Sequence, residues 1–283
     1  MRIKKASIVF SVVIIVLLLL IGLIVSNILN RGTKEVKVAK NFISDLYDSG
    51  VIEENKEIKN EVVKEEALNK ASNENSKIKY SVIVGDYAVS IDKDYNILGF
   101  LNKSIEDANT RSNYIKEDDA IYLAKSYLSK ITKDDCKFKE IRVQEGVASP
   151  VYNIIFYKYR DGYPYYTQEI NTLINKITGK LEGYTNYPIN DMKYIEKINI
   201  DEEEATNILK DNFKRLKLDI TLVEEPMLGY VNISDKEMVL AYIFNIKINN
   251  DNKEENKKDT CISLVRADTG EIVNYNLEAV ARK

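Results

Sequence analysis

The chain holds few of the residue types on which enzymes rely for catalysis. Histidine is absent from its 283 residues, which excludes Ser-His-Asp and Cys-His nucleophiles and any zinc site with histidine ligands. Tryptophan is absent too, so a glycan platform built on tryptophan is excluded. Carboxylate pairs, a lone cysteine and lysine remain as catalytic candidates.

Carboxylates gather at two positions, Glu117-Asp118-Asp119 and the run 201–204. Paired carboxylates can hydrolyse a substrate when an enclosed pocket separates their pKa values, and the sequence indicates no such pocket. Each cluster instead precedes an apolar stripe of helical spacing, where negative charge is favourable in the first turn. We interpret both clusters as helix starts and predict no catalytic residue, so the chain is not expected to be an enzyme.

One segment matches the opening of a calcium-binding loop, Asp92-x-Asp94-x-Asn96. Such a loop needs glycine at its sixth position and glutamate at its twelfth, whereas this chain has Ile97 and Lys103 there. A β-turn explains the segment better. We predict no metal site and no cofactor.

Two cysteines, Cys136 and Cys261, are the only thiols. Neither has the spacing of a CxxC motif or of a metal ligand. They could form one disulfide outside the cell, or they could be two unpaired, buried small residues. The sequence leaves both alternatives open.

Tyrosine is the outstanding local feature, because 12 of the 19 tyrosines lie between Tyr114 and Tyr194. Tyrosine suits binding surfaces, since it combines a large apolar face with a polar tip. It equally suits β-strands, where cross-strand aromatic pairs stabilise the sheet. We predict that an exposed group of tyrosines forms a partner-binding surface, with these members: Tyr157, Tyr159, Tyr163, Tyr165 and Tyr166.

A hydrophobic segment near the N-terminus predicts a membrane anchor. Residues 6–29 carry no charge and are long enough to cross the hydrocarbon core as a helix. Arg2, Lys4 and Lys5 precede the segment, as expected for a cytoplasmic N-terminus. The stretch is longer than that of a cleaved signal peptide, and no small-residue cleavage site follows Val25. We predict an uncleaved single-pass anchor in the cell membrane, with the C-terminal region extracytoplasmic.

The region beyond the anchor is acidic. The chain has 41 basic and 44 acidic residues, and four of the basic residues but none of the acidic ones lie at positions 1–31. The rest therefore carries 37 basic against 44 acidic residues. An acidic region without a concentrated basic stripe argues against nucleic acid as the partner.

A helix followed by strands recurs along the region beyond the anchor. Apolar stripes predict helices over 117–131 and 201–216, and the shift along the chain that places Ala120 on Ala205 also places Leu123 on Ile208. Each helix precedes strands and a closing hairpin whose turn contains Gly179 or Gly270, because glycine accepts the positive φ of such a turn. The predicted strands are 141–143, 151–159, 165–174 and 181–184 in the first copy, and 221–224, 240–248, 260–266 and 272–275 in the second.

The segment before these copies is expected to hold a diverged third unit. Val36 to Leu46 has helical spacing and 62–71 is a second, short helical candidate, followed by strands at 80–84, 87–91 and from Ile97 to Phe100. Asn96 would take the place of glycine in the turn. One helix laid across a short antiparallel sheet is an α+β solution, so the predicted fold class is α+β.

These residues resemble the PepSY-like modules of bacterial envelope proteins, in particular the YcdB/YcdC-type repeat. The resemblance covers residues 115–280 and rests on the acidic helix start at 117–120, the turn Asp161-Gly162-Tyr163-Pro164 with Gly162 as its glycine, and the hairpins 177–184 and 268–275. The second copy lacks the Asp-Gly-Tyr-Pro turn and has a polar insertion at 249–259. The resemblance implies a non-catalytic module that binds or restrains another envelope protein.

The predicted organisation is a cytoplasmic tail and anchor (1–31), a juxtamembrane region (32–112) and two PepSY-like units (113–195 and 196–283). The function expected from it is contact with a protease or other protein of a Gram-positive envelope. Two alternatives stay open. The layout also resembles the YycH/YycI accessory regulators of sensor kinases, and the tyrosines could form a glycan-binding module for the cell wall.

Overall fold

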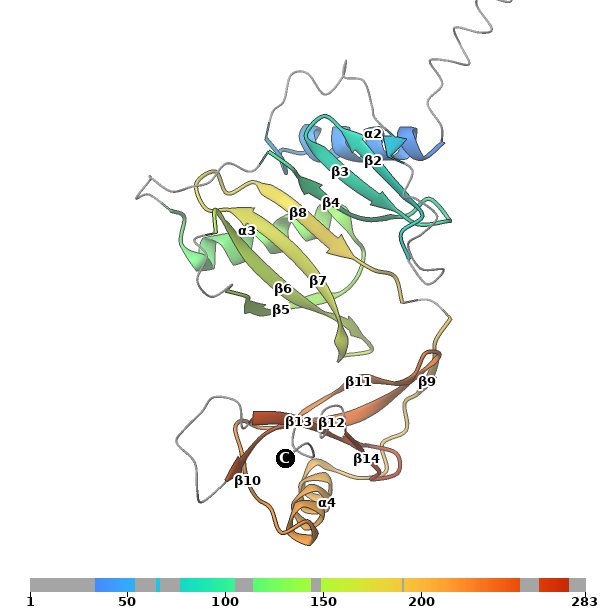
Figure 1. The fold of residues 1–283 in the computed structure, drawn as a ribbon, viewed down its shortest axis with the longest axis vertical. Coiled ribbons are helices and arrows are strands. Elements are labelled where there is room, and N and C mark those ends of the chain that lie inside the picture. Colours follow the sequence, from blue (N-terminus) through green and yellow to red (C-terminus); the bar gives the residue numbers. More distant parts are fainter. Residues whose placement is uncertain are drawn as a thin grey trace, which may run out of the picture. The chain divides into compact units, whose positions relative to one another are not determined.

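The computed structural model describes residues 34–53, 65–66, 77–104, 114–143, 149–189, 191–249 and 260–274. They divide into two compact units, residues 1–106 and 107–283, and the described part of each contains both α-helix and β-strand (Figure 1). The predicted α+β class is confirmed. The predicted anchor at 6–29 lies outside the described residues. Within the described ranges, no helix has the length and apolar character that crossing a membrane requires.

The first unit places one helix beside a small antiparallel sheet. Helix α2 (Lys34–Asp48) buries its apolar stripe, including Ala39 and Ile43, on the side that faces β2 and β3. The strands pair in the order β1 (Glu65–Glu66), β2 (Tyr80–Val84), β3 (Tyr87–Ile91), β4 (Ile97–Asn102). The helix expected from Val36 to Leu46 is confirmed. The helical candidate at 62–71 is wrong where the structure describes it, because residues 65–66 pair with β2 as a strand.

The turn between β3 and β4 is held by hydrogen bonds to the Asp92 side chain. Asp92 Oδ1 accepts hydrogen bonds from the backbone N–H of Asp94 and of Asn96, both at 2.8 Å, and its Oδ2 accepts from the Asn96 side chain at 2.9 Å. This is the β-turn expected from the sequence. The residue with positive φ is Tyr95, at +68°, so the assignment of the glycine role to Asn96 is wrong.

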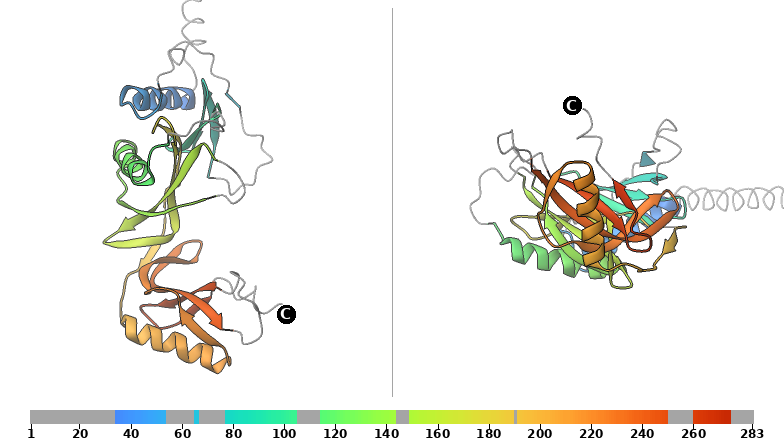
Figure 2. Two further views of the ribbon diagram at one scale, coloured as in Figure 1. Left: turned by 90° about the vertical axis from the view of Figure 1, so that its left-hand side faces the viewer. Right: turned by 90° about the horizontal axis from the view of Figure 1, so that it is seen from below.

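The first half of the second unit, residues 114–189, is one helix on a four-stranded antiparallel sheet. Helix α3 (Glu117–Ile131) packs on the two middle strands, with Ala120, Ala124 and Leu128 buried (Figure 2). The sheet order is β5 (Cys136–Ile141), β6 (Val151–Arg160), β7 (Tyr163–Asn175), β8 (Leu181–Asn186). Phe156 and Ile170 face each other in adjacent strands and are fully buried.

The second half, residues 191–274, is built around one long strand. Helix α4 (Glu202–Arg215) buries Ala205, Leu209 and Phe213 in a core with strands β12 and β13. Strand β12 pairs with β11 and β10 along one side and with β9 and β13 along the other, and β14 pairs with β13. The strands are β9 (Lys193–Ile195), β10 (Asp219–Leu222), β11 (Met227–Ser234), β12 (Glu237–Asn249), β13 (Thr260–Arg266) and β14 (Ile272–Asn274).

Equivalent atoms make equivalent contacts in the two halves. The hydroxyl of Tyr152 donates to the backbone oxygen of Ile115 at 2.8 Å, and the hydroxyl of Tyr242 donates to that of Ile200 at 3.1 Å. Ile115 and Ile200 are related by the same shift along the chain that relates the two helices. In both halves this isoleucine lies just before the helix, and its N–H bonds to the turn of the closing hairpin.

The closing turns are also equivalent. Gly179 and Gly270 have φ of +70° and +73°. A Cβ atom at Gly179 would lie 2.9 Å from Leu123 Cδ1, and one at Gly270 would lie 2.9 Å from Ile208 Cδ1. The positive φ favours glycine at each turn, and the missing Cβ leaves room for the δ-methyl group of the helix residue above it.

The expected strands differ from the observed ones at the sheet edges. β5 begins five residues earlier than expected and ends at Ile141, and Val143 is 78% exposed. β10 lies two residues earlier than expected, and β9 and β11 were not predicted. Gly229 interrupts the apolar pattern of β11. A Cβ there would lie 2.8 Å from the Pro164 carbonyl oxygen, so glycine is needed for a close approach of two backbones.

Replacing the glycines tests the helix-on-turn packing. Gly179→Ala and Gly270→Ala should each lower the free energy of unfolding by about 2–3 kcal/mol, because each adds a strained φ and a methyl group pressed against the helix. Gly162→Ala is the control, since Gly162 has φ of +87° but open space around its Cβ position, and it should lose only about 1 kcal/mol. Thermal unfolding followed by circular dichroism measures the three losses. Equal losses would contradict the packing role.

Candidate functional site

The face of the first-half sheet opposite α3 carries paired aromatic and basic side chains. Alternation along β6 sends Phe156 towards α3 and Tyr157 to the other face, where Tyr157 lies opposite Glu169 of β7. Lys139 Nζ lies 4.6 Å from the ring centroid of Tyr157, and Lys137 Nζ lies 4.3 Å from that of Tyr159. Such cation–π contacts hold the ammonium groups over the rings.

Tyr166 of β7 extends this surface. Its ring centroid lies 5.8 Å from Lys139 Nζ, and its side chain packs against a buried cluster of the second half that includes Val239 and Leu264. Burial raises the pKa of Tyr166, and the neighbouring Tyr157 raises it further. We call the surface made by Tyr157, Tyr159, Tyr166, Lys137 and Lys139 the aromatic face.

An ion-pair network borders the aromatic face along β5. Lys139 Nζ lies 2.5 Å from Glu169, and Arg142 lies 3.2 Å from Glu169 and 2.7 Å from Glu140. Burial alone would raise the pKa of Glu169, but the hydrogen bonds and charges of Lys139 and Arg142 hold it below its usual range. These contacts fix Lys139 over the rings of Tyr157 and Tyr166. Because the paired charges are opposite, the net charge of the aromatic face is close to zero.

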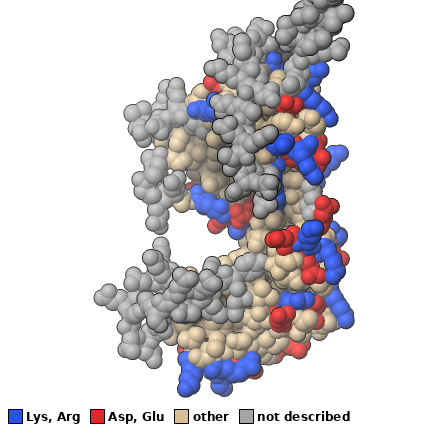
Figure 3. All heavy atoms as spheres, turned by 45° about the vertical axis from the view of Figure 1, so that its right-hand side comes forward, with Lys and Arg blue, Asp and Glu red and all other residues tan. Residues whose placement is uncertain are grey.

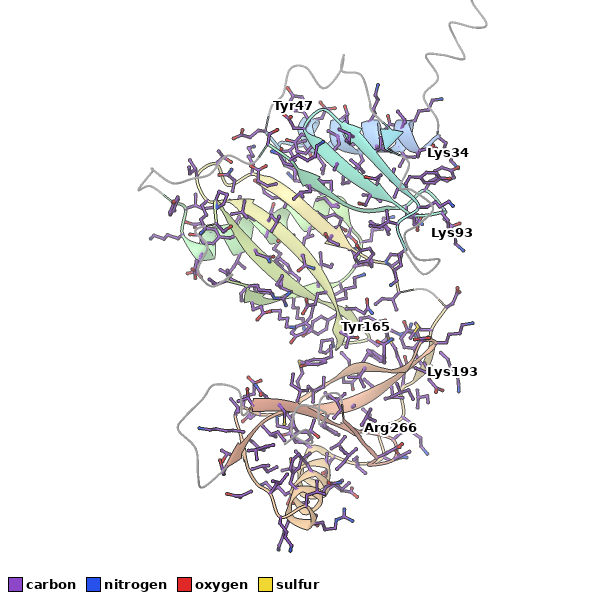
Figure 4. The ribbon with its side chains drawn as sticks, in the orientation of Figure 1. Lys34, Tyr47, Lys93, Tyr165, Lys193 and Arg266 are labelled. Atoms are coloured by element: carbon purple, nitrogen blue, oxygen red, sulfur yellow. The ribbon has the colours of Figure 1, made fainter. Side chains whose placement is uncertain are left out.

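Tyr165 does not belong to this surface, and its expected exposure is wrong. It is 6% exposed, because β7 and β11 pair in parallel at Tyr165 and Tyr230. The two rings stack with centroids 5.2 Å apart. Figure 4 shows Tyr165 at the end of β7 that adjoins β11.

Four tyrosines and one ion pair make up this joint between the halves. Tyr163 and Tyr194 each contact the Tyr230 ring edge-on, and the hydroxyls of Tyr165 and Tyr194 are 3.1 Å apart. The Tyr230 hydroxyl donates to Glu196 at 2.9 Å, and Glu196 lies 3.2 Å from Arg160. Burial is the first cause that raises the pKa of Tyr165 and of Tyr230. We call this group the tyrosine joint: Tyr163, Tyr165, Tyr194, Tyr230, Arg160 and Glu196.

The Asp-Gly-Tyr-Pro turn brings the joint into place. Asp161 and Gly162 have φ of +50° and +87°, as a tight hairpin between β6 and β7 requires. Pro164 then lies against Gly229 of β11. The sequence indicated the turn. It did not indicate that Tyr194 and Tyr230 belong to the joint, because the residues that they contact are distant in the sequence.

Both cysteines are free thiols in the structure. Cys136 lies opposite Lys158 in the first-half sheet, whereas Cys261 lies opposite Ile246 in the second-half sheet. Burial raises the pKa of both thiols. A raised pKa lowers the thiolate fraction and hence the reactivity of both residues.

The acidic clusters lie at helix starts and are exposed. Asp201 caps α4, because its Oδ1 accepts from the Glu204 backbone N–H at 2.8 Å. In the part of the chain that the structure describes, no three residues among cysteines, aspartates and glutamates are grouped as metal ligands. The clusters thus have the helix-start role that the sequence indicated.

The Tyr157 phenol makes the free energy of unfolding depend on pH. Burial, followed by the charges of Glu169 and Glu140, raises its pKa from 10.0 to about 12. The pKa of Tyr157 is therefore higher in the folded chain than in the unfolded chain. Its contribution to the free energy of unfolding is complete below pH 10 and is lost as the pH rises from 10 towards 12. We expect a shallower fall of the unfolding free energy over this range in Tyr157→Phe than in the wild type, measured by urea unfolding at several pH values. An unchanged slope would contradict the assigned pKa.

Comparison with known proteins gives a likeness to solved structures. No family model matches the sequence, and no curated protein matches it. Among solved structures, the chain is similar to the Bacillus megaterium YpeB C-terminal domain, with 19% sequence identity and a TM-score of 0.49. The match covers 86% of this chain and 97% of that domain.

Proposed function

We propose that the protein is a membrane-anchored, extracytoplasmic binding protein that regulates another protein of the cell envelope by direct contact, without a catalytic step. In this proposal residues 6–29 hold the chain in the membrane, and the two halves of the second unit are PepSY-like units. The partner is an envelope protease or a sensor kinase.

The aromatic face is the observation that carries the proposal. Tyr157, Tyr159 and Tyr166 are only partly buried, and Lys137 and Lys139 already hold two of the rings in place. Tyrosines fixed in this way offer a large contact area at low entropic cost, which is why tyrosine is enriched in protein interfaces.

The edge strand beside this face supplies a second element of recognition. Among the described strands, β5 pairs with β6 alone, so its other edge can accept an extended segment of a partner. Its side chains alternate, with Lys137 and Lys139 on the aromatic face and Phe138, 43% exposed, on the other. A bulge between Phe138 and Glu140 interrupts the ladder and limits the pairing to a short segment.

The chemistry of the chain supports binding over catalysis. The sequence has no histidine, the acidic clusters are exposed helix starts, and burial makes both thiols less acidic. Together these features argue against a histidine base, against the two acidic clusters and against both thiols as catalytic groups.

Site-specific photo-crosslinking in cells tests the proposal. A benzoylphenylalanine at Tyr159 should trap one enriched envelope protein from the aromatic face, and mass spectrometry of the adduct identifies it. The control is the same residue at Tyr122, which is 74% exposed on α3 and should give no such adduct. A protease or a kinase at Tyr159 would distinguish the two partner classes.

Identical adduct patterns at Tyr159 and Tyr122 would contradict a specific protein contact at the aromatic face. Retention of the chain on purified cell wall, lost on Tyr159→Ala with Tyr166→Ala, would instead establish the glycan-binding alternative. Tyr165 is unsuitable for either experiment because it is part of the tyrosine joint.

A further inference from the structure

A hollow opens where α4 ends, away from the aromatic face. Helix α4 ends at Arg215, and the chain enters β10 through Lys217, whose φ is +57°. The hollow is a depression that is widely open to solvent, with a volume of about 600 Å³. Its lining residues are Lys210, Lys214, Lys217, Leu218, Asp219 and Ile220.

The hollow is basic on one side and apolar on the other. Lys210, Lys214 and Lys217 contribute three ammonium groups, and none forms an ion pair with a carboxylate within the described ranges. The one carboxylate of the lining, Asp219, accepts a hydrogen bond from Asn249 at 2.8 Å. Figure 3 shows blue side chains gathered at the bottom of the view, where α4 lies in Figure 1.

The helix dipole accounts for only part of this arrangement. Lys214 and Arg215 lie in the last turn of α4, where positive charge is stabilising. Lys210 lies before that turn and Lys217 beyond the helix. Lys210 and Lys214 also lie at the i, i+4 spacing, at which like charges destabilise a helix by a few tenths of a kcal/mol. The helix dipole therefore accounts for Lys214 but not for Lys210 or Lys217.

The first half provides an internal comparison for the helix. The shift that places Ala120 on Ala205 also relates Lys125 to Lys210 and Ser129 to Lys214. The positions of Lys210, Lys214 and Lys217 thus correspond to Lys125, Ser129 and Thr132 in the first half, and Arg215 corresponds to Lys130 in the last turn of α3. The turn after α3 is also closed by the chain itself, because the Asn186 side chain donates to Asp134 at 2.8 Å.

We infer that this hollow binds a phosphate ester. Lysine is a compact point charge and a common phosphate ligand, and three lysines match the charge of a phosphate with a neighbouring anionic group. Leu218 and Ile220 supply an apolar floor for the body of the ligand. A soluble phosphate ester and the headgroup of an anionic phospholipid share this chemistry.

The test uses the full-length chain in phosphatidylcholine nanodiscs. Calorimetric titration with glycerol phosphate probes the soluble ester, and co-sedimentation with phosphatidylglycerol vesicles probes the lipid. One variant combines Lys210→Ser, Lys214→Ser and Lys217→Asn. Its affinity for the probe should be lower than that of the wild type by about tenfold for each lysine removed. Asparagine is used at 217 because it tolerates positive φ.

A charge-matched variant serves as the control. Lys116→Ser, Lys125→Ser and Lys236→Ser remove three exposed lysines elsewhere and should leave binding unchanged. Lysine-dependent binding of glycerol phosphate assigns a soluble ester, and such binding to vesicles alone assigns a lipid headgroup. The inference is overturned if neither probe binds, or if the two triple variants lose binding equally.

Discussion

Each helix of the second unit packs against the glycine turn of its own closing hairpin, and this contact helps to set the position of the helix on the sheet. Leu123 and Ile208 press on Gly179 and Gly270, and a tyrosine hydroxyl ties the chain just before each helix to the sheet. In the first half the Tyr127 hydroxyl adds a bond to the Gly179 carbonyl oxygen at 3.0 Å. The contact fixes where the helix crosses the strands and therefore which sheet face stays available.

The tyrosines divide between two roles because of this geometry. The helix covers one face of the first-half sheet and leaves the other to Tyr157 and Tyr159, with Lys137 and Lys139 over their rings. Farther along the same hairpin, the Asp161-Gly162 turn directs Tyr165 to β11, where pairing and stacking bury it. One group of tyrosines therefore joins the halves, and the other lies on the sheet face where we propose that a partner binds.

The sequence was informative wherever a contact is local. The stripe of α3 and the acidic start of α4 predicted both helices, and the Thr-Gly turns predicted both closing hairpins, because spacing and φ are set by neighbouring residues. Strand β11 was missed because Gly229 serves a contact with Pro164, which is distant in the sequence. The burial of Tyr165 was missed for the same reason, since it depends on Tyr230. The lysines of the hollow are close in the sequence, and the i, i+4 spacing of Lys210 and Lys214 already places these two on one helix face.

The division of the tyrosines is the central claim, and hydroxyl-radical footprinting of the full-length chain tests it directly, because this chemistry reports side-chain accessibility without requiring a phenolate. The predicted result is ready oxidation of Tyr122, slower but clear oxidation of Tyr157, Tyr159 and Tyr166, and protection of Tyr165 and Tyr230, which are 6% and 1% exposed. Oxidation of Tyr165 at the rate of Tyr122 in the folded chain would contradict the tyrosine joint and, with it, the separation of a structural group from a binding group.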